Sequence, residues 1–215
     1  MGSSNCPSDL RGPARDALVA AIRGAYEEAN GIYDPGRGLG DTLYGQAVYS
    51  VASHNITRAF EGWPGADVVS RGRGPELHIG GNRVRWNKVG RGTDGGGIRG
   101  RYPRGSRATA AMASENQMVL FTEDAFEPDG IATNWILAHL GNPIEGLVAI
   151  YLASPIETDG DSVTGWRDII AIWSASDPMS EYPYAPVPGL PEPVELDELD
   201  IRLRDDEGDA ATELT

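Results

Sequence analysis

The chain has 215 residues, of which 40% are hydrophobic, and a formal net charge of −14. This size and apolar content suit one core of ordinary size, and the single cysteine, Cys6, excludes an internal disulfide framework and a multi-cysteine zinc site. None of the three histidines lies at a metal-ligand spacing, so no metal or cofactor is predicted. No signal-peptide pattern and no apolar run of about 18 residues occurs, which predicts a cytoplasmic protein without a membrane span.

The charges are segregated along the chain. Residues 71–107 hold ten Arg and Lys residues against two acidic ones, whereas residues 177–215 hold twelve acidic residues against two Arg. A protein this acidic overall is repelled from nucleic acid at long range. Only the basic segment is therefore a candidate for contact with phosphate.

The N-terminal part predicts two helices. Residues 1–12 are expected to be disordered, with Cys6 exposed to solvent. Apolar residues recur at helical spacing over residues 14–29, after Pro13 and before the stop signal of Asn30 and Gly31. A second helix is predicted over residues 42–60, with Asp41 as its N-cap.

A β-hairpin is predicted over residues 76–89, because two strand-like runs flank Gly80 and Gly81. A short strand over residues 67–69 precedes it. In the second run of the hairpin, apolar residues alternate with arginines, so one face is expected to meet the core and the other to meet solvent. The core-facing pair is Val84 and Trp86, and the solvent-facing pair is Arg83 and Arg85.

The hairpin also carries the weak catalytic candidates of the chain. His78 and Glu76 would lie beside Arg83 and Arg85, and a His and a Glu can exchange protons in RNA cleavage. A cross-strand set of charges on an exposed face is the competing interpretation. A nuclease built on two acids and a lysine is disfavoured, because Lys88 is the only lysine and has no carboxylate at the required spacing.

Residues 90–107 are rich in glycine and arginine and predict a flexible arm. Gly90, Gly92 and Gly95 match the dinucleotide fingerprint, but further glycines and Pro103 follow where that fingerprint requires a helix. The arm is a candidate for tracking a nucleic-acid backbone, and a solvated loop or contact with an acidic protein surface are the alternatives. The candidate phosphate contacts and the candidate stacking residue are Arg91, Arg99, Arg101, Tyr102, Arg104 and Arg107.

The remaining segments complete a sheet. Residues 118–121 are predicted as a strand, and residues 132–140 and 147–153 as a buried central hairpin with His139 as a hydrogen-bonded core residue. Residues 163–173 fit both helix and strand patterns, and we favour a strand. From residue 177 the chain is rich in proline and acid, which predicts a disordered tail.

These elements predict one α+β domain over residues 13–176. Two N-terminal helices are expected to pack on one face of a mostly antiparallel sheet of about five or six strands. The arm at residues 90–107 and the tail at residues 177–215 would extend from this domain.

Two stretches, residues 138–150 (AHLGNPIEGLVAI) and residues 114–121 (SENQMVLF), resemble uncharacterised proteins of actinobacteria and their phages. Those proteins are often encoded beside Xre regulators that carry an ImmA/IrrE metallopeptidase-like domain. The resemblance implies a two-gene toxin–antitoxin or phage-defence unit, and it transfers no functional residue because the shared motifs are structural.

The leading hypothesis is a non-enzymatic component of such a unit that acts through a protein partner encoded by the neighbouring gene. The first alternative is a toxin enzyme that acts on nucleic acid or a nucleotide through the arginine-rich hairpin and arm. The second is a DNA-binding regulator, although no helix-turn-helix pattern is present.

Overall fold

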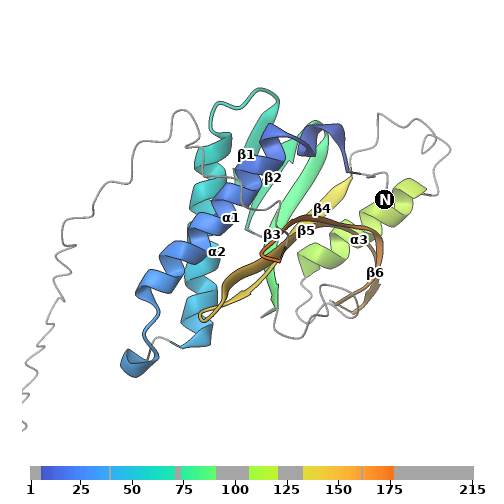
Figure 1. The fold of residues 1–215 in the computed structure, drawn as a ribbon. Helices are drawn as coiled ribbons and strands as arrows, with labels where there is room; N and C mark the ends of the chain where they lie inside the picture. Colours follow the sequence, from blue (N-terminus) through green and yellow to red (C-terminus); the bar gives the residue numbers. More distant parts are fainter. Residues whose placement is uncertain are drawn as a thin grey trace, which may run out of the picture. The chain divides into compact units, whose positions relative to one another are not determined.

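Three α-helices and a six-stranded sheet make up the part of the chain that the computed structural model describes, residues 6–38, 40–70, 74–90, 107–120, 133–160 and 162–176 (Figure 1). The chain divides into two units, Met1–Ala185 and Pro186–Thr215, and every described residue lies in the first. The elements are η1 (Ser8–Leu10), α1 (Pro13–Ile32), η2 (Pro35–Arg37), α2 (Asp41–Phe60), β1 (Ala66–Ser70), β2 (Pro75–Ile79), β3 (Asn82–Gly90), α3 (Arg107–Leu120), β4 (Asn134–Asn142), β5 (Gly146–Asp159) and β6 (Ser162–Ser174).

Within the described residues, the strands follow one another across the sheet in chain order. Neighbouring strands are antiparallel except β3 and β4, which run parallel. A parallel pair needs a crossover connection, and α3 lies in the connection between these two strands. The predicted α+β fold, with two N-terminal helices on a mostly antiparallel sheet, is confirmed. Both predicted hairpins and the strand favoured over residues 163–173 are also present.

The two long helices form because each has one apolar side. Buried residues recur every four positions along α2, which is the spacing of one helix face. α1 is rich in alanine, the best helix former, and its small side chains let α2 approach closely. The Asn55 side-chain nitrogen in α2 donates a hydrogen bond of 3.2 Å to the backbone oxygen of Ala21 in α1.

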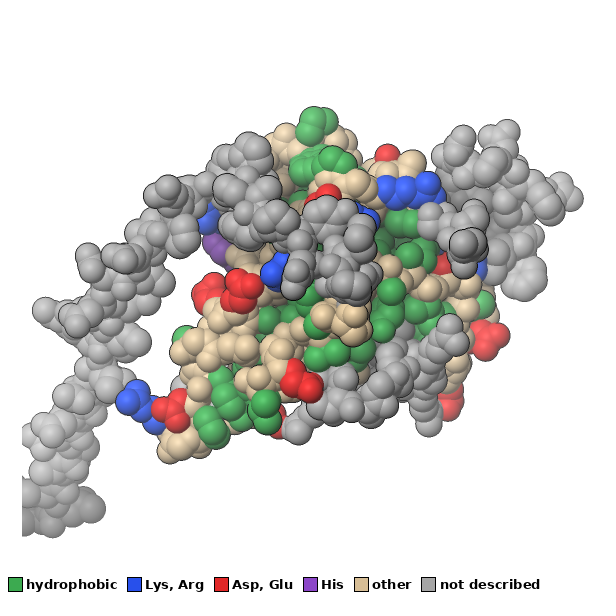
Figure 2. Space-filling view, in the orientation of Figure 1, with side chains coloured by type: hydrophobic (Ala, Val, Ile, Leu, Met, Phe, Trp, Pro, Cys, Tyr) green, Lys and Arg blue, Asp and Glu red, His purple; other side chains and the backbone are tan. Residues whose placement is uncertain are grey.

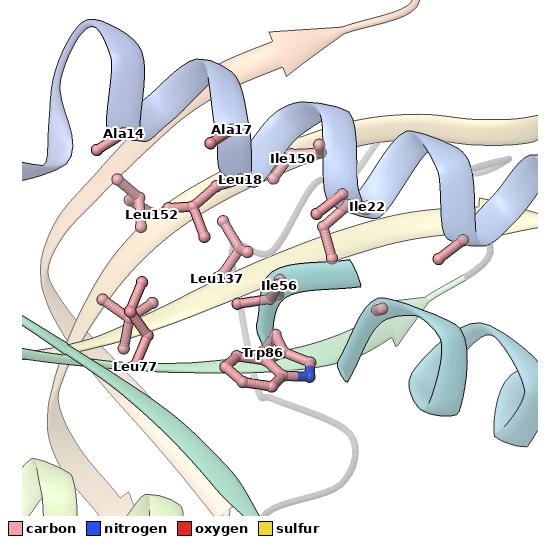
Figure 3. Close-up of a cluster of buried hydrophobic side chains, with 14 of the residues drawn as sticks. Ala14, Ala17, Leu18, Ile22, Ile56, Leu77, Trp86, Leu137, Ile150 and Leu152 are labelled. Carbon is pink, nitrogen blue, oxygen red and sulfur yellow. The ribbon is translucent and has the colours of Figure 1, made fainter. Parts of the chain in front are cut away.

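The main core lies between this helix pair and one face of the sheet (Figure 3). Leu18 and Ile22 of α1 and Ile56 of α2 are each 0% exposed. Each large apolar side chain buried in this way contributes about 1.5–3 kcal/mol of transfer free energy. The sheet side chains that they meet include Leu77, Trp86, Leu137, Ile150 and Leu152.

The opposite face of the sheet has a smaller core and carries α3. Ile136 and Ala153 are paired across β4 and β5 and belong to this second cluster, which includes neither Leu137 nor Leu152. Residues 118–120 are the last turn of α3, so the strand predicted at residues 118–121 is wrong there. A run of three or four apolar residues fits a helix end as well as a strand, and the alanine-rich residues before it continue the helix.

The predicted disorder at the N-terminus is wrong for residues 6–12. Cys6 is 7% exposed and Leu10 is 0% exposed, and both belong to the main core. The Arg11 Nε donates a hydrogen bond of 2.7 Å to the Cys6 backbone oxygen, which holds the η1 turn in place. The predicted exposed thiol is therefore buried, because this short turn places its apolar residues against α1.

Two helix ends differ in detail from the predictions. α1 continues to Ile32, past Asn30 and Gly31. Asp41 is the first residue of α2, and Gly40 occupies the cap position without a side-chain hydrogen bond. The predicted tail at residues 177–215 and the arm, apart from Gly90 and Arg107, lie outside the described residues.

Candidate functional site

On the β2–β3 hairpin, the structure brings two of the candidate side chains, His78 and Arg85, to the carboxylate of Glu76. His78 pairs with Arg83 across the two strands. The two oxygens of Glu76 face different partners, with His78 Nε2 at 3.4 Å and Arg85 Nε at 3.4 Å. The carboxylate of Glu76 therefore bridges the imidazole of His78 and the guanidinium of Arg85.

α3 adds a second carboxylate to this cluster. Glu115 forms a salt bridge with Arg83, and Arg83 Nε also donates a hydrogen bond of 2.8 Å to the side-chain oxygen of Asn134. The side-chain nitrogen of Asn134 donates a hydrogen bond of 3.0 Å to Glu115, so Arg83, Asn134 and Glu115 form a closed ring of contacts. Charge-assisted bonds of this kind are about twice as strong as neutral ones, so the ring ties β3 and β4 to α3.

The expectation that Arg85 faces solvent is wrong. Arg85 is 7% exposed, whereas Val84 and Trp86, at 0% and 2%, lie in the main core as predicted. The alternation correctly separates the two faces of β3. The second face is nevertheless not open to solvent at Arg85, and its guanidinium is held by Glu76.

The geometry of His78 and Glu76 bears on the acid–base alternative. General acid–base catalysis requires each group to reach a proton on the substrate. Glu76 contacts both His78 Nε2 and the buried Arg85, so its two oxygens are engaged within the hairpin, whereas the side chain of His78 is 38% exposed. The double engagement of Glu76 favours the interpretation as a cross-strand set of charges.

Sequence reasoning missed Asn116, the most buried polar residue of α3. Its side-chain oxygen accepts a 2.9 Å hydrogen bond from the backbone nitrogen of Asn134, and its nitrogen donates to the backbone oxygens of Asn134 and Pro155 at 3.0 and 2.8 Å. The amide thus satisfies backbone groups where the β4–β5 ladder ends. One sequence signal could have predicted its burial, because Asn116 continues the helical spacing of residues that are buried in the structure, namely Thr109, Met112 and Ala113.

A second buried polar cluster lies under the helix pair. His139 is 0% exposed, and its Nδ1 lies 2.9 Å from the hydroxyl of Tyr26, which confirms a hydrogen-bonded core histidine. Burial, with a smaller effect from the charge of Lys88, lowers the pKa of His139 to about 3. Burial raises the pKa of Tyr44 to about 12 and also raises that of Tyr26, so this cluster is neutral near pH 7 except at Lys88.

Asn142 builds the turn between β4 and β5 that follows this cluster. Its side-chain oxygen accepts hydrogen bonds of 2.9 Å from the backbone nitrogens of both Ile144 and Glu145, and its nitrogen donates to the Glu145 carboxylate at 2.8 Å. At the preceding Gly141, an added Cβ would collide with the ring of Tyr26 and with a backbone oxygen. Only glycine allows α1 to approach the strand this closely.

Of the candidate phosphate contacts of the arm, the structure describes Arg107. Arg107 is the first residue of α3 and is exposed. The other candidates, Arg91, Arg99, Arg101, Tyr102 and Arg104, lie outside the described residues. Among the residues that the structure describes, no group of three or more His, Cys, Asp or Glu side chains is arranged to hold a metal ion.

The fold and the site define an α+β protein whose mostly antiparallel sheet carries a polar cluster beneath α3. No protein-family model, curated protein or solved structure matches the chain. The resemblance of residues 114–121 and 138–150 to actinobacterial and phage proteins therefore stays a prediction. Of the helices described, none combines the length and the apolar character needed to cross a membrane.

Proposed function

We propose that the chain is a non-enzymatic component of a bacterial or phage toxin–antitoxin or defence unit and acts through a protein partner encoded by the neighbouring gene. The observation that supports the non-enzymatic part of this proposal is the mutual engagement of the candidate catalytic side chains, and the partner is what the resemblance of residues 114–121 and 138–150 implies. Glu76 contacts both His78 and Arg85, and Arg83 is bound by Glu115 and Asn134.

This engagement favours a structural role because the side chains satisfy one another. A guanidinium that binds phosphate donates its hydrogen bonds to the ligand. Here Arg83 donates to Asn134 and pairs with Glu115, and the buried Arg85 pairs with Glu76. Breaking such a half-buried network to admit a substrate costs the hydrogen bonds that join the hairpin to α3.

Co-expression with the product of the neighbouring gene tests the proposal. We expect the two chains to co-elute as one complex in size-exclusion chromatography, at a volume smaller than that of either chain alone. Two separate peaks would count against the pairing.

The enzyme alternative is tested by His78→Ala, with His54→Ala as the matched control because His54 is exposed on α2. The proposal expects both variants to keep the wild-type phenotype in cells. Loss of toxicity with His78→Ala alone, at an unchanged melting temperature and with the complex intact, would favour a toxin enzyme acting on nucleic acid or a nucleotide. A gel shift with the gene's own promoter tests the regulator alternative.

The segregated charges supply a separate test for contact with nucleic acid through residues 83–107. If the acidic residues 177–215 shield the basic segment, their deletion raises binding of DNA or RNA at low salt. The gain should fade as salt approaches about 0.5 M, because screening weakens exposed charges. Unchanged binding after the deletion would remove the shielding idea.

A further inference from the structure

We infer that the partner docks on the end of the molecule formed by the C-terminal end of α1, the N-terminal end of α2 and the β4–β5 turn. We call this region the turn-end surface, with Ile32, Leu43 and Ile144 as its apolar residues. The partner is a protein surface with an apolar pocket rimmed by Lys and Arg. This inference rests on the proposed function and names the surface that carries it.

Exposed apolar side chains are concentrated on the turn-end surface. Four large hydrophobic residues of the described chain are exposed, and Ile32 at 57%, Leu43 at 46% and Ile144 at 92% belong to this end. Only Tyr49, at 39%, lies elsewhere, in the middle of α2. The three segments come together at the lower left of Figure 1, and Figure 2 shows hydrophobic atoms exposed there. Single exposed apolar residues need no explanation, but a group at one end indicates an interaction site.

The β4–β5 turn presents Ile144 on a rigid support. The buried Asn142 side chain accepts hydrogen bonds from the backbone nitrogens of Ile144 and Glu145, and it donates to the carboxylate of Glu145. The backbone oxygen of Asn142 accepts a hydrogen bond of 3.3 Å from the hydroxyl of Tyr44 in α2. Binding through a turn that is already ordered loses little conformational entropy.

Contacts between the helices and the turn hold the surface in one arrangement. The Tyr44 hydroxyl has one proton, which it shares between the backbone oxygen of Asn142 and the side-chain oxygen of Asn30, 2.6 Å away and two residues before Ile32. The rings of Tyr33 and Tyr44 meet edge to face, with centroids 5.5 Å apart. Tyr44 therefore links α1, α2 and the turn directly beneath the three apolar residues.

The charges around the turn-end surface identify the chemistry of the partner. Acidic residues lie within four positions in sequence of each apolar residue, namely Glu28 and Asp34 for Ile32, Asp41 for Leu43 and Glu145 for Ile144. Asp34 is paired with Arg37 at 3.2 Å, and Lys88 Nζ lies 6.0 Å from the ring centroid of Tyr44, so Glu28, Asp41 and Glu145 supply the acidic character of the rim. An acidic rim favours a basic partner surface and disfavours the same end of a second copy of this chain, because like charges across an interface repel.

A photo-crosslinking amino acid at position 144, in the full chain expressed in the cells from which the gene comes, tests the surface independently of the partner's identity. Position 49 is the matched control, because Tyr49 is exposed but lies away from this end. We expect position 144 to form an adduct with the neighbouring-gene product or with another basic protein, identified by mass spectrometry, and position 49 to form none; an adduct only with acidic proteins would also overturn the inference. No adduct at position 144, equal adducts at both positions, or an adduct of two copies of this chain would overturn the inference.

Affinity measurements with the purified neighbouring-gene product then test the energetics. Replacing a well-packed anchor costs about tenfold or more in affinity, so Ile144→Ser should raise the Kd by at least that factor while Tyr49→Ser leaves it unchanged. Glu28→Lys should weaken binding most at low salt. Ile144→Ser and Glu28→Lys should keep the wild-type melting temperature, because both side chains are exposed.

The outcomes separate the two proposals. If the neighbouring product does not bind the wild-type chain but position 144 still gives a specific adduct with a basic protein, the pairing is wrong and the surface stands. If the neighbouring product binds and Ile144→Ser changes nothing, the pairing stands and the surface is wrong.

Discussion

Acid is expected to destabilise the protein through one buried imidazole. Burial, with help from the charge of Lys88, lowers the pKa of His139 from 6.5 to about 3. In the unfolded chain this imidazole has its ordinary pKa. Between about pH 6.5 and pH 3 the unfolded chain therefore holds a proton that folded His139 does not, so the free energy of unfolding falls as the pH falls through this window.

The size of the effect follows from the distance in pH. His139 stays neutral in the folded protein, so each pH unit below its unfolded pKa of about 6.5 lowers the free energy of unfolding by about 1.4 kcal/mol. At pH 5 the loss is therefore about 2 kcal/mol. The free energy of unfolding of natural domains is about 5–15 kcal/mol, so a loss of this size is easy to measure. At pH 7.5 the same group contributes almost nothing, because both states are neutral.

Urea unfolding at pH 7.5 and pH 5.0 checks this prediction in the wild type, His139→Gln and His54→Gln. Glutamine does not titrate and can still accept a hydrogen bond from Tyr26. The His54 variant removes an exposed imidazole as the matched control. We expect the wild type and His54→Gln to lose about 2 kcal/mol more on acidification than His139→Gln. An equal loss in the wild type and His139→Gln would refute the reasoning, because His139 would then not be held neutral by the core.

Three further predictions concern single positions. Asn116→Ala should lower the free energy of unfolding by about 2–4 kcal/mol, since it leaves several buried backbone groups unpaired, whereas Ala at the exposed Gln117 should change it by less than about 0.5 kcal/mol in the same denaturation assay. Gly141→Ala should lower the free energy of unfolding by about 2 kcal/mol, because the new Cβ collides with the ring of Tyr26. At Gly45 nothing lies within 4 Å of an added Cβ, so Gly45→Ala should raise the melting temperature through about 0.5–1 kcal/mol of helix propensity. Cys6 should react slowly with a thiol reagent until denaturant is added, because burial raises its pKa and blocks access, and fast labelling of the folded protein would show that residues 6–12 are not packed.

Local patterns were sufficient where one face of an element is apolar. The spacing in α1 and α2 and the glycine pair between β2 and β3 predicted these elements nearly to their ends. Patterns failed where contacts far along the chain decide the outcome. The η1 turn is polar in sequence yet places Leu10 in the core. The error at residues 118–120 has a local cause, because these residues continue α3.

The candidate site shows the same division. The sequence placed His78, Arg83 and Arg85 on one hairpin, and the structure brings His78 and Arg85 to one carboxylate, that of Glu76. The sequence did not reveal that Glu115 of α3 would form a salt bridge with Arg83. That contact depends on the crossover between the parallel strands β3 and β4, whose geometry no local spacing encodes.

By itself, the sequence determined the α+β class, the two N-terminal helices, both hairpins and the segregation of charge, because each of these depends on side-chain period or composition. Only the tertiary structure decided which polar groups are satisfied and which side chains are exposed. It buries Cys6 and Arg85, and it leaves Ile144 exposed on a rigid turn. Burial is a property of what several distant segments place around a residue, so it follows from packing rather than from the residue and its neighbours in sequence.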